Sequence, residues 1–352
     1  PILPWDFSAL NTAAAVAGSY ELSLTWRLCV GIALLLLLTW MLRGQYRKGR
    51  FRLRREDLRH RSIVLIAGLL CLIPIAYPQF YGLFGVKTDV WDQLGAYQTG
   101  GAAAEFLRNP EFMEVDQPDN STPENIAAIV NTVSDDPTPA VSAEHPNVLA
   151  IMNESWADFE DFGNITLSES VIDYISSLPN AIFGHAYTSV FGAGTSTSEF
   201  EFLTGNSMNF LPSGSIPYQQ YILGPSDSLA TLLKGCGYET RAFHPGERTS
   251  WQRSTAYPRL GFDSFKCGED MDVPQTEEHG YVSDDSDFEQ IIWEFEHKDE
   301  NTPLFLFNVT IQNHGSYTVE DYPAEVQVAD EPGVYPKAEQ YLTLANKTDE
   351  AF

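Results

Sequence analysis

Two long apolar segments, separated by a short basic stretch, constrain this chain more than any other feature. Residues 22–42 contain one charged side chain, Arg27, and residues 62–86 contain none. About 20 helical residues are needed to cross the ~30 Å hydrocarbon layer of a membrane. The sequence therefore predicts two transmembrane helices, at about 22–42 and 62–86. Two buried core helices are the alternative.

The basic stretch between these segments predicts their orientation. Residues 43–61 hold nine of the ten Lys and Arg residues found before residue 63. Short loops rich in Lys and Arg stay in the cytoplasm. We therefore expect a multi-pass protein of the cell membrane, with a membrane region at 1–87, a cytoplasmic loop at 43–61 and an extracellular remainder.

The charge of the remainder excludes one class of partner. The chain has 352 residues and a formal charge of −27, and residues 63–352 hold 44 acidic but only 11 basic side chains. Nucleic-acid phosphates require a basic surface, so we expect no nucleic-acid partner. The four cysteines form no C-x-x-C motif for zinc, and the sequence leaves open whether Cys236 and Cys267 pair.

Two parts follow the membrane region. Residues 88–145 predict an extracellular helix at 88–108 and an acidic, proline-rich linker with a short helix at 123–133 capped by Thr122. Residues 146–352 alternate between apolar runs and amphipathic stretches. The alternation predicts an α/β domain with a mainly parallel sheet between helices. The expected strands are 147–152, 181–188, 238–243 and 304–311, and the expected helices are 168–178, 226–236, 285–297 and 336–352.

Polar clusters follow the predicted strands or begin helices, where ligands bind in parallel sheets. Each cluster alone has an ordinary explanation: a helix-terminal carboxylate, a capping box or a loop histidine. Together they would bring a carboxylate, a hydroxyl at a helix N-terminus, two imidazoles and a guanidinium to one edge, a set that suits displacement at phosphorus or sulfur. The residues are Glu154, Thr195 with Glu199, His244 with Trp251 and Arg253, and His314.

These clusters resemble the lipoteichoic acid synthase family, membrane phosphoglycerol transferases within the alkaline phosphatase and sulfatase superfamily. The resemblance covers about residues 146–320. It rests on NVLAIMNES (147–155), GTSTSEFEFLTGNS (194–207), the run from GYETRAFHP to WQR and LGFD (237–263), and FNVTIQNHGSY (307–317). It implies that residues 146–352 form an extracellular sulfatase-like catalytic domain.

The resemblance also implies roles for single residues. Glu154 would be a metal ligand, and Thr195 would be the catalytic nucleophile and a second metal ligand. The implied metal is Mn²⁺, with Mg²⁺ or Zn²⁺ as alternatives. The pocket for the phosphoglycerol head group would be lined by His244, Trp251, Arg253 and His314. Two positions depart from the family pattern: Gly194 replaces a basic residue of some members, and Gln252 replaces the more usual Asn.

The implied activity is transfer of phosphoglycerol from phosphatidylglycerol, a membrane lipid, to a cell-envelope polymer or glycolipid through a phosphothreonine intermediate. A phosphoethanolamine transferase, a phosphodiesterase or sulfatase, and a non-catalytic membrane sensor are the alternatives. The family completes its metal site with a later Asp-His pair, which this sequence does not contain. We therefore expect that pair beyond Phe352, a catalytic domain that is incomplete at its C-terminus, weak metal binding by these residues alone, and further membrane helices before Pro1.

Overall fold

The computed structural model describes residues 93–112, 115, 120–133 and 145–352, the last range without 164, 191, 193, 213–214 and 319–321, together with isolated positions between 33 and 66. Residues 93–112 belong to one compact unit and residues 115–352 to another. Apart from the isolated positions, the predicted membrane segments and the loop at 43–61 lie outside these residues. Within the part that is described, no helix is long and apolar enough to cross a membrane.

The helix predicted at 88–108 is divided. The structure has α4 (Gln93–Gly100), α5 (Ala102–Arg108) and the 3-10 helix η4 (Asn109–Phe112). Gly101 separates α4 from α5 with a φ of 86°, a left-handed conformation that interrupts the helix. In the linker, α6 (Pro123–Val133) matches the predicted helix, and Thr122 Oγ1 accepts a hydrogen bond from Asn125 N at 3.3 Å.

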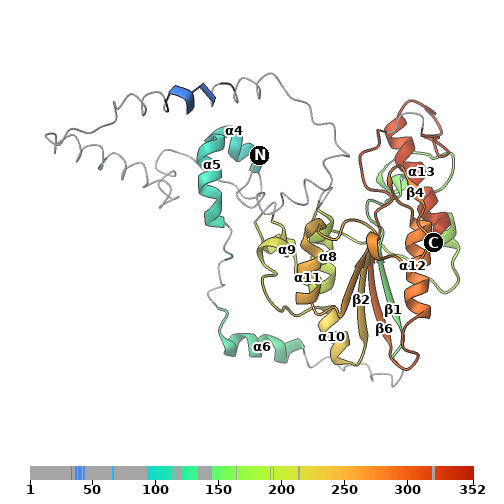
Figure 1. Cartoon of the computed structure of the whole chain (residues 1–352), viewed down its shortest axis with the longest axis horizontal. Helices are drawn as coiled ribbons and strands as arrows, with labels where there is room; N and C mark the ends of the chain where they lie inside the picture. Colours follow the sequence, from blue (N-terminus) through green and yellow to red (C-terminus); the bar gives the residue numbers. More distant parts are fainter. Residues whose placement is uncertain are drawn as a thin grey trace. The chain divides into compact units, whose positions relative to one another are not determined.

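A four-stranded parallel sheet forms the centre of the second unit (Figure 1). Its order is β1 (Val148–Met152), β6 (Leu304–Val309), β2 (Glu239–His244) and β3 (Ser264–Cys267). The predicted α/β domain with a mainly parallel sheet is therefore confirmed. Two short antiparallel strands, β4 (Glu277–Glu278) and β5 (Tyr281–Val282), make a hairpin, which we call the β4–β5 hairpin.

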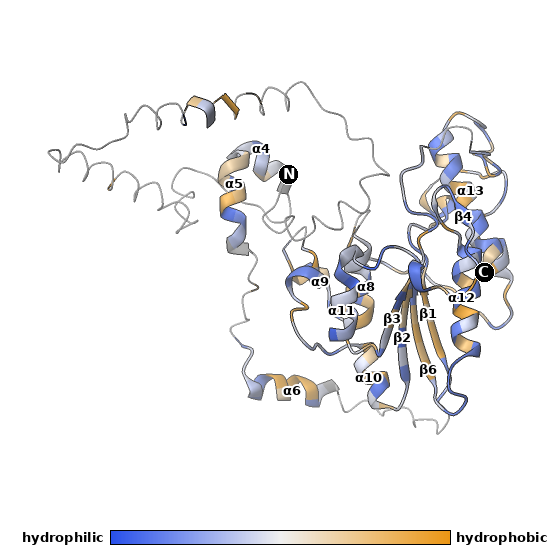
Figure 2. Ribbon diagram, in the orientation of Figure 1, coloured by the Kyte–Doolittle hydropathy of each residue, from blue (hydrophilic) through white to orange (hydrophobic). Residues whose placement is uncertain are grey.

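Helices cover both faces of the sheet. One face packs against α8 (Thr195–Thr204), α9 (Pro217–Gln220), α10 (Leu229–Gly235) and α11 (Arg253–Arg259), and the other against α12 (Asp284–Glu296) and α13 (Pro336–Ala351). β6 is buried throughout: Phe305 and Phe307 face α8–α11, whereas Leu304 and Leu306 face α12. Side chains alternate across a strand, so a strand covered on both faces is apolar along most of its length, as Figure 2 shows for β6, in which Asn308 is the polar exception.

Short elements complete the described chain. They are α7 (Asp173–Ser177) and the 3-10 helices η5 (Phe159–Phe162), η6 (Met208–Phe210), η7 (Ser250–Gln252) and η8 (Gly268–Asp270). The helix predicted at 168–178 is shorter than expected because its first residues pair with another segment instead. Leu167 bridges Val328, and Ser168 N donates to Gln327 O at 2.8 Å.

One predicted strand is wrong. Residues 181–188 form neither helix nor strand, although their β-branched and aromatic composition favours a strand. Ile182 and Tyr187 are 99% and 94% exposed, so none of the described residues gives this segment a sheet surface on which to pack. The other predicted strands and the helices at 226–236, 285–297 and 336–352 are confirmed, with ends shifted by up to three residues.

Candidate active site

The predicted clusters meet at the carboxyl edge of the sheet. Glu154 follows β1, His244 is the last residue of β2, and His314 follows β6. Thr195 is the first residue of α8, whose N-terminus reaches the same edge because its hydroxyl contacts Glu154. Residues from four elements therefore form one site.

Thr195 and Glu154 are the centre of this site. The Thr195 hydroxyl donates a hydrogen bond of 2.7 Å to Glu154 Oε1, and both residues are buried. Gly194 precedes α8 with a φ of 69°, and no side chain caps the helix. The capping-box alternative for residues 195–199 is therefore wrong, and the Thr195 hydroxyl is directed at a carboxylate.

Glu154 is held in a desolvated position. Its backbone N–H donates to Thr310 Oγ1 at 3.0 Å, and His314 Nε2 lies 4.0 Å from its Oε1. Burial raises the pKa of Glu154, and the nearby His314 and the Thr195 hydrogen bond offset only part of that rise. The carboxylate would therefore gain from a bound cation.

Arg253 is held by a carboxylate that the sequence analysis assigned only to a helix cap. Arg253 donates to Glu199 through Nε at 3.1 Å and through Nη2 at 2.6 Å, and both side chains are almost completely buried. The hydroxyls of Tyr257 and Tyr218 donate to Glu199 Oε2 at 2.7 and 3.2 Å. Burial alone would lower the pKa of Arg253, but the negative charge of Glu199 outweighs it and the pKa is raised.

His244 is buried as a neutral imidazole. Burial, and then the positive charge of Arg253, lower the pKa of His244 well below its ordinary value. Its Nδ1 lies 2.8 Å from the carbonyl oxygen of Val309, which can only accept, so Nδ1 carries the hydrogen. A Cβ at Gly246 would lie 2.5 Å from His244 Nε2, so glycine is required there.

Trp251 occupies an unusual backbone position. Trp251 and Gln252 have φ values of 55° and 60°, left-handed values that lead directly into α11 at Arg253. The Trp251 side chain packs against the core on the α8–α11 face. Glu154 therefore lies close to both Thr195 and His314, and Arg253 lies near His244. Contact of Trp251 with a substrate stays a prediction.

The supporting roles of Glu199, Tyr257 and Thr310 were not predicted from the sequence, although helix spacing contained a signal for two of them. Glu199 lies four residues after Thr195 in α8, and Tyr257 lies four residues after Arg253 in α11. Residues four apart lie on one face of a helix, so each pair was predictable as neighbours. The hydroxyl of Thr310, which holds Glu154 N, had no such signal.

The residues present fit a hard divalent cation. Glu154 offers a carboxylate and Thr195 a hydroxyl at one desolvated point, an oxygen donor set that suits Mn²⁺ or Mg²⁺. The raised pKa of Glu154 shows that this carboxylate lacks full compensation from the protein.

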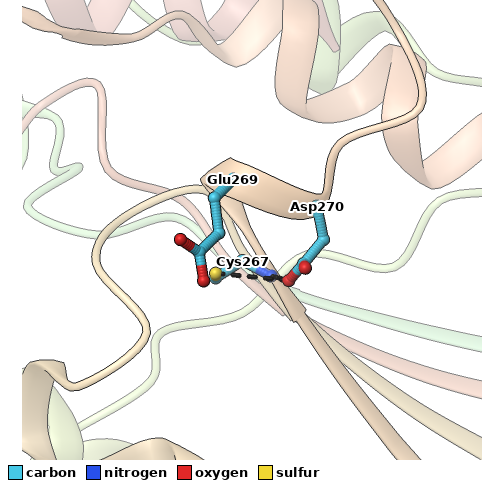
Figure 3. A group of neighbouring side chains, drawn as sticks. All are labelled: Cys267, Glu269 and Asp270. Atoms are coloured by element: carbon cyan, nitrogen blue, oxygen red, sulfur yellow. Dashed lines mark hydrogen bonds between the residues drawn. The ribbon is translucent and has the colours of Figure 1, made fainter.

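A second group of ligand-type side chains lies at the end of β3, where Figure 3 shows Cys267, the last residue of the strand, with Glu269 and Asp270. The Cys267 thiol donates to Asp270 at 3.3 Å, and burial raises its pKa to about 11. Arg248 forms ion pairs with Glu269 and with Asp270, so both carboxylates already have a cationic partner. Cys267 is a free buried thiol and Cys236 a free exposed one, so the two do not pair in this structure.

Comparison with known proteins agrees with this fold. Residues 146–352 match the family described as Sulfatase. The chain is 36% identical over 236 residues to a protein of Rhizobium meliloti (strain 1021) whose name assigns it to cyclic beta-1,2-glucan modification, a match that covers 66% of this chain and 35% of that protein. It is 26% identical over 191 residues to the lipoteichoic acid synthase of Staphylococcus saprophyticus, covering 53% and 29%. The chain thus spans about a third of the length of these relatives.

Among solved structures, the phosphoglycerol transferase GacH of Streptococcus pyogenes, in complex with sn-glycerol-1-phosphate, is similar with a TM-score of 0.57. The sequence identity is 22%, and the match covers 67% of this chain and 64% of that one. At this identity the likeness shows the fold. Because the matched family model covers residues 146–352, more than half of the chain, this protein belongs to the sulfatase family.

Proposed function

We propose that this protein transfers phosphoglycerol from phosphatidylglycerol to a cell-envelope polymer or glycolipid. The observation that carries the proposal is the Thr195 hydroxyl at the start of α8, hydrogen-bonded at 2.7 Å to the buried Glu154 carboxylate. A helix N-terminus stabilises negative charge, which favours both an alkoxide and a phosphoryl group at this point.

Thr195 is the nucleophile of the proposed reaction. Its Oγ1 attacks phosphorus, an Oγ1–P bond forms, and the bond from phosphorus to the diacylglycerol oxygen breaks. The result is phosphoglyceryl-Thr195 and diacylglycerol. His314, whose Nε2 lies 4.0 Å from Glu154 Oε1, carries the threonine proton to the departing oxygen. An acceptor hydroxyl then takes the phosphoglycerol group and restores Thr195.

Glu154 and Thr195 would hold the divalent cation, Mn²⁺ by family resemblance. Such a cation lowers the pKa of a hydroxyl bound to it. Glu154 also orients the Thr195 hydroxyl through the hydrogen bond already described.

Arg253 and His244 complete the phosphate side of the site. The positive charge of Arg253 acts on both His244 and Glu154, so it reaches the place where the phosphoryl group would lie. Arg253 binds phosphate oxygens in this proposal, His244 contributes a neutral imidazole, and Trp251 packs on the glycerol carbons.

The proposed setting is extracellular. Helices at 22–42 and 62–86 would hold the catalytic domain beside its lipid donor, which raises the effective concentration of that donor. This arrangement agrees with a chain whose basic residues gather at 43–61 and whose later part is strongly acidic.

A second acceptor class has its own support. The 36% identity to a protein named for cyclic beta-1,2-glucan modification favours a glucan hydroxyl as acceptor. The chemistry at Thr195 would be the same, because only the second half of the reaction changes.

Intact-protein mass spectrometry tests the proposal. The full-length protein, incubated with phosphatidylglycerol, should gain one phosphoglycerol group, and Thr195→Ala should abolish the adduct and reduce transfer about 10³-fold or more. Thr204→Ala, in the same helix, removes a hydroxyl that donates to the Phe200 carbonyl and accepts from Asn206 N, and it should keep the adduct. An adduct that survives Thr195→Ala would refute the assignment. Supplying phosphatidylethanolamine or a sulfate ester instead separates the alternative activities.

A further inference from the structure

His314 lies on a loop, so its side chain must be fixed by contacts rather than by a helix or strand. β6 ends at Val309, and residues 310–318 have no helix or strand. The His314 Nδ1 lies 2.7 Å from the carbonyl oxygen of Gly315 and 3.2 Å from the Tyr281 hydroxyl. Its Nε2 lies on the Glu154 side, 4.0 Å from Oε1. The two ring nitrogens therefore face different partners.

These contacts select one tautomer of His314. A carbonyl oxygen only accepts, so Nδ1 carries a hydrogen in the 2.7 Å contact with Gly315. The Tyr281 hydroxyl donates to the same carbonyl oxygen at 3.2 Å. The Gly315 carbonyl is thus held from two sides, and a neutral His314 keeps its lone pair on Nε2, toward Glu154.

Tyr281 belongs to the β4–β5 hairpin, whose turn makes a second contact with the same loop. His279, in that turn, lies with its Nε2 2.6 Å from the carbonyl oxygen of Gln312. Its ring lies 5.2 Å from that of Tyr281 and stacks on Tyr317 at 6.3 Å. Burial lowers the pKa of His279, which keeps the ring neutral.

The backbone of His279 is strained in a way that these contacts explain. Its φ is 38°, a left-handed value that a residue with a Cβ rarely adopts. Such conformations persist only where the surrounding contacts over-determine them, and they gather where a structure must hold a functional group. Here the conformation places the His279 ring against the carbonyl of Gln312.

We propose that the β4–β5 hairpin positions His314. His279 holds the loop at Gln312, and Tyr281 holds the Gly315 carbonyl and Nδ1, so His314 presents an unprotonated Nε2 to the reacting groups. The inference rests on the proposed function, which gives His314 the proton transfer. Tyr281 and His279 are positioning residues, because they act through His314 and its loop.

The test compares Tyr281→Phe with Tyr322→Phe in the full-length protein. The Tyr322 hydroxyl donates to Glu278 of the hairpin at 2.8 Å, so the control removes a hydroxyl that contacts the hairpin and leaves the His314 contacts in place. Nitrogen-15 NMR of histidine-labelled protein reports which ring nitrogen carries the hydrogen. The spectra are recorded at pH 9, where an ordinary imidazole is neutral, and His314→Gln identifies the signal.

Wild type and Tyr322→Phe should show His314 with the hydrogen on Nδ1, whereas Tyr281→Phe should show a mixture of both tautomers. In the transfer assay, Tyr281→Phe should lower kcat about 10-fold with KM unchanged, the size of effect seen when a group that orients a ligand is removed. His279→Gly, which accepts the positive φ, should lower kcat in the same way.

The NMR measurement needs no substrate, so it separates this proposal from the proposed function. An inactive wild type whose His314 carries its hydrogen on Nδ1, and loses that preference in Tyr281→Phe, refutes the transfer reaction and supports the positioning. An unchanged tautomer in Tyr281→Phe overturns the positioning, whatever the rates show.

Discussion

Two groups at the same edge of the sheet each bring an arginine to carboxylates, yet they differ in burial. Arg253 and Glu199 have side chains that are 1% and 0% exposed. Arg248 meets Glu269 and Asp270 after β3, with side chains 38%, 68% and 33% exposed. Residue types alone would not separate the two groups. Desolvation therefore distinguishes a candidate catalytic site from a solvated ion cluster.

The carboxylates of the two regions also differ in the direction of their pKa shifts. In the candidate active site, to which Arg253 belongs, burial raises the pKa of Glu154, whose Oε1 accepts a hydrogen bond from the Thr195 hydroxyl. By contrast, hydrogen bonds from Cys267 and Arg248 outweigh burial and lower the pKa of Asp270. A cation would therefore stabilise the charge of Glu154 further, whereas Cys267 and Arg248 already stabilise the charge of Asp270.

The largest expected difference is in the unfolding free energy that is lost when each arginine loses its carboxylate partner. Glu199→Gln leaves the Arg253 charge buried without its counter-charge, which should cost about 3–5 kcal/mol of unfolding free energy. Glu269→Gln removes a solvated partner of Arg248 and should cost about 1 kcal/mol or less. Urea unfolding of both variants measures the two costs. Equal losses would show that burial does not separate the groups.

The next contrast concerns metal. Glu154→Gln should weaken Mn²⁺ binding about 100-fold or more, because it removes a direct ligand, and even the loss of a partner that only orients a ligand costs about 10–100-fold. Glu269→Gln should leave the binding constant unchanged, because Arg248 already occupies that carboxylate. Calorimetric titration of Mn²⁺ into the full-length protein measures both. Loss of binding in Glu269→Gln alone would show that the metal site is the group of Cys267, Glu269 and Asp270.

The smallest expected effect is a pH dependence of opposite sign in the two groups. The folded pKa of Glu154 lies above its ordinary 4.5, so its contribution to stability is present below pH 4.5 and is lost as pH rises through the folded pKa. Glu154→Gln should therefore stabilise the metal-free protein near pH 7 and have little effect near pH 4, where the carboxyl is largely protonated in both states.

The folded pKa of Asp270 lies below its ordinary 3.8, so its contribution is present above pH 3.8 and is lost as pH falls through the folded pKa. Asp270→Asn should therefore destabilise the protein near pH 7, by less than about 1 kcal/mol because the pair is solvated. Unfolding measured between pH 3 and 8 in the presence of chelator checks both signs. The same sign in both variants would contradict the comparison.

Local sequence pattern predicted the central elements well. β1, β6, α12 and α13 were identifiable because each is a hydrophobic or amphipathic run bounded by polar residues. The four polar clusters were also identifiable, because each follows a predicted strand or begins a helix. β3 was missed because it is only four residues long and half-exposed, with Lys266 among them.

Pairings between distant residues could not be predicted in the same way. Arg253 and Glu199 are 54 residues apart in the chain, and Tyr281 and His314 are 33 apart. The sequence around each of these residues does not indicate its partner, because each contact forms only when the sheet has assembled. The same reason explains the strand wrongly predicted at 181–188, whose composition favours a strand but which pairs with no other strand among the residues that the structure describes.

One turn of α8 has a mechanical consequence. Thr195 and Glu199 are four residues apart on a rigid helix, and Glu199 holds Arg253. A displacement of α8 therefore carries the hydroxyl and the guanidinium together, whereas the contacts that hold His314 come from the β4–β5 hairpin and not from α8. In the proposed reaction the helix keeps the spacing between the nucleophile and the phosphate-binding cation constant, and the hairpin sets the place of His314 separately.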